Sequence, residues 1–257
     1  MRCRLIICED YDPFFNMAFD YYFWKNCERP ESFPVLRFYK WCPSSVSIGY
    51  NQMEEKIVNL DFCKKSNIPI VMRPTGGSAI FHDIEITYSF CADLKTHFYF
   101  SSPFLSYISV CNGIIKGIEK IGIKLEIRGI SECKEPSFTN IPCFSLSSRH
   151  DIIYNGRKIV GSAQRRNNYS FLQHGSILID IREDLWKNIF LKGVDFSKII
   201  CLKKIVGDTK EEELRDFLKK GFEEVFEFEI FEDELESKEI KEIEKIQEKL
   251  KKEGKYE

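Results

Sequence analysis

The chain has 257 residues, of which 43% are hydrophobic, enough for one large domain or two small ones with a substantial core. Its 38 basic and 40 acidic residues nearly cancel, and the pI is about 6.2. A nucleic-acid-binding domain normally carries a strongly basic face, so this balance argues against a nucleic-acid partner. The pair Arg165-Arg166 could dock an acidic protein, although such pairs more often end a solvated strand.

The cysteines and the apolar runs indicate the compartment. Ten cysteines are present, but none forms a C-x-x-C pair, which excludes zinc-ribbon and thioredoxin-type motifs. The first apolar run is too short for a signal peptide, and no later run approaches a membrane span. We therefore expect a cytoplasmic protein without a membrane partner, whose cysteines are mostly small buried side chains.

The first third of the chain predicts alternating helices and strands. Pro13–Cys27 has helical periodicity, with Asp12 as N-cap and proline at the first helical position, and is expected to be an amphipathic helix. The other elements expected before the glycine-containing turn are strands at Val35–Tyr39 and Val46–Gly49, a helix at Glu54–Lys65 and a strand at Ile68–Met72.

The middle of the chain contains a strand, a helix and an irregular segment. Ile84–Cys91 alternates apolar and polar residues as a half-buried strand does, and Phe104–Ile121 is periodic as a core-facing helix that stops at Gly122. Gly129–Ser148 shows no periodicity. A segment of that length inside a compact domain is usually functional or disordered.

A hairpin and a charged C-terminal region follow. Asn155-Gly156 is a strong hairpin signal, so His150–Tyr154 should pair with Arg157–Ala163 through a two-residue turn. Gly175–Ile181 predicts another strand. The remainder predicts helices, with an apolar stripe in Glu211–Phe226 and a narrow one in Glu232–Glu257. We expect a catalytic domain over residues 1–205 and a helical extension over residues 206–257 packed on it.

Two glycine-bearing, cationic turns stand beside apolar strands. The first runs from Arg73 through Thr75, Gly76, Gly77 and Ser78, and the second from Gly156 to Gln164. Glycine leaves room for a ligand, and exposed N–H groups can cradle an oxyanion. The first turn lacks the lysine spacing of a P-loop and the G-x-G-x-x-G pattern of a dinucleotide site.

Lys158 stands in the predicted hairpin opposite Ile153, so alternation puts it on one face with Ile153 and Val160. An ammonium group on an apolar face is costly unless it extends to solvent, pairs, or meets a negative ligand. A diagonal ion pair with Asp151 and a functional role are both open from spacing alone.

Cys143 lies in the irregular segment that leads into this hairpin. A free thiol has a pKa of about 8.5, and a nearby lysine cation could lower it by roughly one to three units. A nucleophilic thiolate would follow. The alternative is that Cys143, like most of the ten cysteines, is a small buried side chain.

His82-Asp83 follows the first glycine turn. No second ligand stands at zinc-site spacing, so a metal site is not expected. Hydrogen bonding that stabilises the turn is the first interpretation of His82, and general-base chemistry is the second. Arg73 is expected to face the same pocket, with the capping of a strand end as the alternative.

Several motifs in one order resemble a known family. They begin with Leu36-Arg37-Phe38-Tyr39-Lys40-Trp41 and Ser47-Ile48-Gly49-Tyr50-Asn51-Gln52, and continue with Arg73-Pro74-Thr75-Gly76-Gly77 through His82-Asp83. Pro142-Cys143-Phe144, Gly156-Arg157-Lys158 through Gln164, and Gln173-His174-Gly175-Ser176-Ile177-Leu178 complete the set. The chain resembles the biotin/lipoate protein ligase superfamily, and within it the LipM-type octanoyltransferases.

This resemblance implies an α+β fold with a central, largely antiparallel or mixed sheet flanked by helices. It implies transfer of an octanoyl group from acyl carrier protein to a lysine of a lipoyl-domain protein, such as glycine cleavage H protein. Cys143 would carry the acyl thioester and Lys158 would lower its pKa. No cofactor or metal is implied. Residues expected to contact substrate are Arg73, Thr75, Gly76, Gly77, Ser78, His82, Gly161, Ser162 and Ala163.

Two departures from the family pattern concern the pocket lining. Met72-Arg73 stands where the family usually has two arginines, and Ser78 stands at a position that is glycine in ligases and often arginine in transferases. Three alternatives remain. An ATP-dependent lipoate–protein ligase would use ATP and Mg²⁺, an amidotransferase would move octanoyl groups between lipoyl domains, and a binding module would need no nucleophile.

Overall fold

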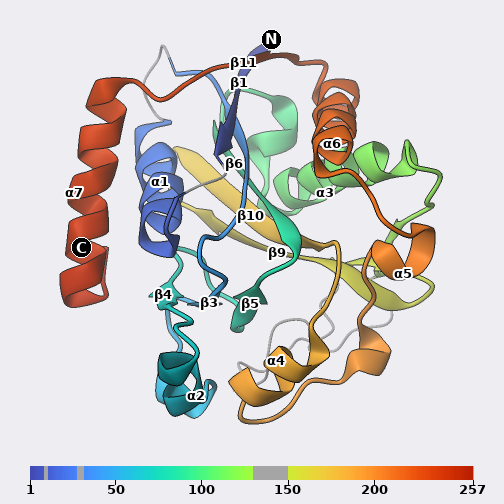
Figure 1. Cartoon of the computed structure of the whole chain (residues 1–257). Coiled ribbons are helices and arrows are strands. Elements are labelled where there is room, and N and C mark those ends of the chain that lie inside the picture. The colour runs from blue at the N-terminus through green and yellow to red at the C-terminus, as the bar shows by residue number, and fades with distance from the viewer. Residues whose placement is uncertain (9–10, 28–31, 130–149, 257) are drawn as a thin grey trace.

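A computed structural model describes residues 1–8, 11–27, 32–129 and 150–256 (Figure 1). The strands are β1 Arg2–Cys8, β2 Val35–Tyr39, β3 Ser45–Ile48, β4 Ile70–Met72, β5 Ile80–His82, β6 Glu85–Asp93, β7 Glu126–Ile127, β8 Ile152–Tyr154, β9 Arg157–Arg166, β10 Ser170–Leu178 and β11 Glu229–Glu232. The α-helices are α1 Pro13–Asn26, α2 Leu60–Lys65, α3 Pro103–Glu119, α4 Glu183–Ile189, α5 Lys203–Val206, α6 Glu211–Phe226 and α7 Ser237–Glu253. Short 3₁₀ helices are η1 Glu54–Lys56, η2 Phe98–Ser101 and η4 Phe196–Lys198.

The strands form two sheets. The large one has the order β11-β1-β2-β6-β10-β9-β8-β7, and the small one β4-β3-β5. β1 runs parallel to β2 and β11, and the other pairs of the large sheet are antiparallel. The expected mixed, largely antiparallel sheet flanked by helices is confirmed.

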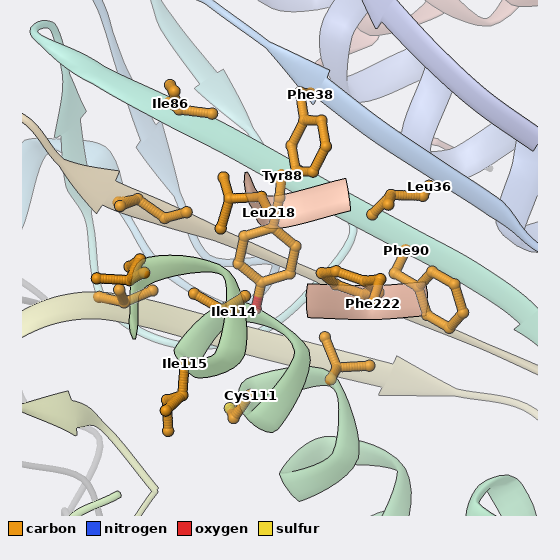
Figure 2. Packing of buried hydrophobic residues seen from close by; sticks show 14 of the residues in the cluster. Leu36, Phe38, Ile86, Tyr88, Phe90, Cys111, Ile114, Ile115, Leu218 and Phe222 are labelled. Atoms are coloured by element: carbon orange, nitrogen blue, oxygen red, sulfur yellow. The ribbon is translucent and has the colours of Figure 1, made fainter. Parts of the chain in front are cut away.

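One face of the large sheet packs against α3 and α6 (Figures 1 and 2). Residues of β2 and β6 point toward the two helices, with Phe90 at the centre of a cluster of aromatic rings. The helices approach closely because glycines face each other: a Cβ on Gly117 would lie 2.6 Å from Leu218 Cα, and one on Gly221 would lie 2.2 Å from Gly113 O. We call this side of the sheet the core face.

The opposite side, which we call the site face, is covered by α1 and the small sheet. Asp12 caps α1 by accepting hydrogen bonds from Phe14 N and Phe15 N, with Pro13 at the first position, as predicted. The expected amphipathic pattern is wrong, because α7 packs along the outer side of α1 and buries nearly all of that helix (Figure 1). β6 is likewise buried on both faces rather than half-buried, since each face of the sheet is covered.

Other predicted elements differ in extent. The single helix expected over Glu54–Lys65 is divided into η1 and α2, because Val58 leaves the helix to bridge Phe190 and Asn59 caps α2. β10 begins earlier than the strand predicted from Gly175. The hairpin turn is confirmed, with positive φ at Asn155 (49°) and Gly156 (76°).

The segment Gly129–Ser148 falls almost entirely outside the described residues, and Cys143 with it. Beyond residue 205, α6 packs on α3, β11 joins the sheet edge and α7 packs on α1. The division into residues 1–205 and 206–257 stays a prediction.

Candidate active site

A cavity lies on the site face, between the large sheet and the small one. Gly161, Ser176, Thr87 and Tyr39 are successive partners on β9, β10, β6 and β2, so they form one row across the sheet beneath it. The cavity encloses about 390 Å³, part of it open to solvent.

Six of the residues expected to contact substrate line this cavity: Arg73, Gly77, His82, Gly161, Ser162 and Ala163. Thr75, Gly76 and Ser78 belong to the same turn but are not among its described lining residues. Residues that sequence reasoning did not select also line it, including Met17, Trp41, Ser47, Ile80, Thr87 and His174. The roles of all these residues in binding stay predictions.

Arg73 fixes the glycine turn from inside. Its side chain is 3% exposed, and its guanidinium donates to the carbonyl oxygens of Gly76 (2.8 Å), Ser78 (2.8 Å) and Ser47 (3.2 Å). Gly77 has φ +90°, and a Cβ there would lie 2.9 Å from Arg73 Nη2. The turn therefore needs both an arginine at 73 and glycine at 77.

His82 stands in a buried chain of hydrogen bonds. Its Nδ1 lies 2.6 Å from Glu85 Oε1 and its Nε2 lies 2.7 Å from Ser47 Oγ, while Trp41 stacks on the ring at 3.9 Å. Asp83 turns away to accept from Ser44 and to pair with Arg182. The two neighbouring residues thus belong to different interactions and share no ligand site.

A second chain of the same type ends on the turn. Thr75 Oγ1 lies 2.6 Å from His174 Nε2, and His174 Nδ1 lies 2.8 Å from Asp20 Oδ2. Burial lowers the pKa of His174, with Arg73 and His82 adding to the effect while Asp20 opposes it. Asp20 and Glu85 could have been suspected from sequence only as carboxylates among apolar neighbours.

Lys158 is 3% exposed and forms an ion pair with Asp151, Nζ to Oδ1 2.8 Å. The pairing of Lys158 with Ile153 is confirmed, but the shared face with Val160 is wrong. A β-bulge makes Ile159 an extra residue, so Val160 pairs with Ile152 and points to the core face, opposite to Lys158. The bulge therefore puts the ammonium on the site face, where Gly161 and Ala163 also lie.

Most cysteines of the described residues are small buried side chains, as expected. Cys3, Cys27, Cys63, Cys91, Cys111 and Cys201 are buried and Cys42 is exposed. Burial raises the pKa of the Cys63 thiol to about 11, and the pKa of Cys111 rises for the same reason. The thiols of Cys63 and Cys111 are therefore poor nucleophiles near neutral pH.

The basic pair Arg165-Arg166 is held by intramolecular contacts. Arg165 donates to Pro74 O at 2.7 Å and stacks between the rings of Trp24 and Tyr50. Arg166 donates to Ser106 Oγ and Phe100 O, both at 2.8 Å. The pair therefore supports the glycine turn and the start of α3, and a docking role for acidic proteins is not indicated.

Comparison with known proteins agrees with this architecture. Residues 12–223 match the family described as lipoyl protein ligase A/B catalytic domain, and the chain belongs to that family. It is 32% identical to octanoyltransferase LipM of Clostridioides difficile, over 97% of this chain and 96% of that protein. It is 31% identical to octanoyltransferase LipM of Staphylococcus aureus, over 93% of this chain and 92% of that protein. These relatives identify the chain as an acyltransferase enzyme of the LipM type.

Solved structures show the same fold. A lipoate-protein ligase A bound with ATP superposes with a TM-score of 0.83 at 23% identity, covering 97% of this chain and 95% of that one. A second structure is a bi-partite lipoate protein ligase of Thermoplasma acidophilum, described with its E2 lipoyl domain. It superposes with a TM-score of 0.78 at 23% identity, covering 97% of this chain and 93% of that one. Within the described residues, no helix is long and apolar enough to cross a membrane.

Proposed function

We propose that the protein moves an octanoyl group from acyl carrier protein to a lysine of a lipoyl-domain protein, such as glycine cleavage H protein, through a thioester on Cys143. The similarity to LipM octanoyltransferases over nearly the whole chain carries this proposal. The family match supports a role in lipoylation.

The cavity has a shape that suits an acyl chain. It extends from β9 to β2, three strand spacings of about 4.8 Å, or roughly 14 Å between backbones. An extended octanoyl chain with bonds of about 1.5 Å is roughly 9 Å long, which leaves room for the side chains of Met17 and Trp41 at the far end. Burying its methylenes at about 0.8 kcal/mol each would contribute roughly 5 kcal/mol of binding.

The proposed first step is attack of the Cys143 thiolate on the thioester carbonyl of the donor. The carbon–sulfur bond to the carrier breaks, and the carrier's sulfur leaves as a thiolate that takes a proton from solvent. The Lys158 ammonium, oriented by Asp151, favours the thiolate, and N–H groups near Gly76-Gly77 stabilise the oxyanion. Such stabilisation is worth about 3–4 kcal/mol. This route uses no metal or cofactor.

The experiment is mass spectrometry of the protein after incubation with octanoyl-acyl carrier protein. We expect a mass increase of one octanoyl group, lost in Cys143→Ala and kept in Cys42→Ala, a matched change at an exposed cysteine. An unmodified wild type, or transfer that survives Cys143→Ala, contradicts the covalent route.

Two further donors separate the related reactions. Octanoylated H protein as the better donor would indicate an amidotransferase. Modification from octanoate with ATP and Mg²⁺, accompanied by pyrophosphate release, would indicate a ligase. Octanoyl-acyl carrier protein as the best donor supports the proposal.

A further inference from the structure

A row of stacked side chains runs beside the glycine turn. The ring of Tyr256 stacks on Tyr21 with centroids 4.7 Å apart, and Tyr21 meets the edge of Trp24 at 5.9 Å. The Arg165 guanidinium carbon lies 4.7 Å from the centroid of the Trp24 ring and 4.6 Å from that of Tyr50. We call these five residues the outer stack. The three inner rings are buried, and Tyr50 is exposed.

Three members of the outer stack donate to the first limb of the turn. These hydrogen bonds run from Tyr256 Oη to Met72 O at 2.5 Å, from Arg165 Nη1 to Pro74 O at 2.7 Å and from Tyr50 N to Thr75 O at 3.0 Å. Arg73 holds the carbonyl oxygens at positions 76 and 78 from the inside. The turn is therefore fixed on both sides, by one arginine within it and by donors distant in sequence.

The Tyr256 hydroxyl supplies a partner that the small sheet does not. β4 is an edge strand that pairs only with β3, and Arg73 N donates to Ile48 O at 2.9 Å. Successive residues of a parallel strand face opposite sides, so the Met72 carbonyl points away from β3. Burial raises the pKa of the Tyr256 phenol well above its usual range, and Asp20 adds to the effect. The hydroxyl therefore stays a donor at neutral pH.

Tyr256 is placed by α7, which lies along α1 (Figure 1). Ile243 of α7 is fully buried, and Gln247 Nε2 donates to Asp12 Oδ2 at 2.6 Å, on the residue that caps α1. The chain leaves the helix at Gly254, whose φ is +65°. The position of α7 on α1 is thus linked to the position of the glycine turn.

We infer that Tyr256 and Arg165 are positioning residues for acyl transfer, which act by holding the glycine turn against the cavity. Gly77 of that turn lines the cavity, so a shift of the turn moves part of the cavity wall. The inference rests on the proposed function, in which N–H groups of the turn stabilise the oxyanion. Since that charge develops only in the transition state, a displaced turn slows acylation and leaves donor binding nearly unchanged.

The test compares wild type with Tyr256→Phe, which keeps the ring and loses the donor, and with Arg165→Met. Single-turnover formation of the acyl-enzyme is followed over a range of octanoyl-acyl carrier protein concentrations. We expect the maximal rate to fall about 10–10²-fold in both variants, within the effect of about 1 Å of misplacement. The half-saturating concentration should stay within about threefold of wild type.

Two variants serve as controls and should acylate within about threefold of wild type. Tyr169→Phe removes a hydroxyl from an exposed tyrosine between β9 and β10. Ile243→Val removes one buried methyl group from α7 and should lower the free energy of unfolding about as much as Tyr256→Phe does. It separates the hydrogen bond to the turn from a general loss of stability.

Alkylation of Cys143 distinguishes a displaced turn from a disturbed nucleophile. Iodoacetamide reacts with a thiolate by displacement of iodide, and no oxyanion forms. Its rate at Cys143, followed by the mass of the peptide, should stay within about threefold of wild type in Tyr256→Phe and Arg165→Met.

Three results would overturn the positioning role: equal slowing of alkylation and acylation, an equal loss of acylation in Ile243→Val and Tyr256→Phe, or a change confined to the half-saturating concentration. Wild-type acylation in both Tyr256→Phe and Arg165→Met would overturn it as well. A wild type that forms no acyl-enzyme would contradict the proposed function instead, and this inference with it.

Discussion

Gly76 and Gly77 are neighbours in the turn but meet different surroundings. A Cβ on Gly76 would have no heavy atom within 4 Å, whereas a Cβ on Gly77 would lie 2.9 Å from Arg73 Nη2 at φ +90°. The folded chain therefore requires glycine at 77 and tolerates a side chain at 76. Free space at 76 is consistent with the approach of a ligand to the backbone there.

Alanine substitutions should separate these two requirements. We expect the free energy of unfolding of Gly76→Ala to lie within about 0.5 kcal/mol of the wild-type value. The rate of octanoyl transfer should nevertheless fall about 10²-fold, because a methyl group at 76 would displace the substrate, and a displacement of about 1 Å has an effect of that size. Gly77→Ala should lose about 1–3 kcal/mol through backbone strain. Urea unfolding and steady-state transfer measure both effects, and full activity in Gly76→Ala would exclude contact with substrate at that position.

The buried pair Lys158–Asp151 also combines structure and chemistry. Lys158→Met leaves Asp151 buried without that cation and should cost about 3–5 kcal/mol of stability. In the double variant Lys158→Met/Asp151→Leu no charge is buried, so stability should return to within about 1 kcal/mol of wild type. Acyl-enzyme formation should stay lost. If the double variant also regains acylation, the lysine has only a structural role.

At residue scale, the sequence found partners only where they stand close together in the chain. The ion pair of Lys158 with Asp151 was one of the two interpretations open from spacing. The partner of Thr75 could not be found in this way, since Thr75 meets His174 99 positions later and His174 meets Asp20 154 positions earlier. Only the folded sheet brings such residues together.

At the scale of elements, prediction succeeded where local chemistry decides. The Asn155-Gly156 hairpin and the cap of α1 follow from turn and cap residues alone. Prediction failed where tertiary contacts decide, as in the bridge from Val58 to Phe190 that divides the expected second helix. The bulge at Ile159 has no such local signal, and it reversed the expected side of Val160.

The contact between α3 and α6 gives a graded test of helix packing. A Cβ on Gly113 would meet only the Phe222 ring, 3.1 Å away, while Cβ atoms on Gly117 and Gly221 would meet backbone at 2.6 and 2.2 Å. We expect Gly117→Ala and Gly221→Ala to destabilise by about 1–3 kcal/mol despite the better helix propensity of alanine. Gly113→Ala should be nearly neutral.

Urea unfolding measures this series, and the activity of the folded fraction supplies the control. The helices cover the core face, away from the cavity, so octanoyl transfer per folded molecule should not change. Equal unfolding free energies for all three variants would contradict the close approach of the helices.

At the scale of the whole molecule, stability should depend on pH through His174. Its pKa is lowered in the folded state by burial, so below about 6.5 the unfolded chain binds more protons at this position than the folded one. The free energy of unfolding therefore rises with pH up to about 6.5 and falls as pH drops, by at most about 1.4 kcal/mol per unit for one proton.

His174→Gln should flatten this dependence, measured by urea unfolding between pH 5 and 7.5. His97→Gln is measured beside it, because His97 is half-buried and burial lowers the pKa of its imidazole as well. This variant shows how much of the pH dependence comes from His97. An unchanged slope in His174→Gln would mean that other groups cause the loss of stability in acid.

One contact spans most of the chain. The hydroxyl of Tyr256, whose ring stacks on Tyr21, donates to Met72 O at 2.5 Å, immediately before the arginine that shapes the glycine turn. The two residues are 184 positions apart. On the ribosome, the turn is synthesised long before this tyrosine, so the hydrogen bond to Met72 forms only after residue 256 has left the exit tunnel.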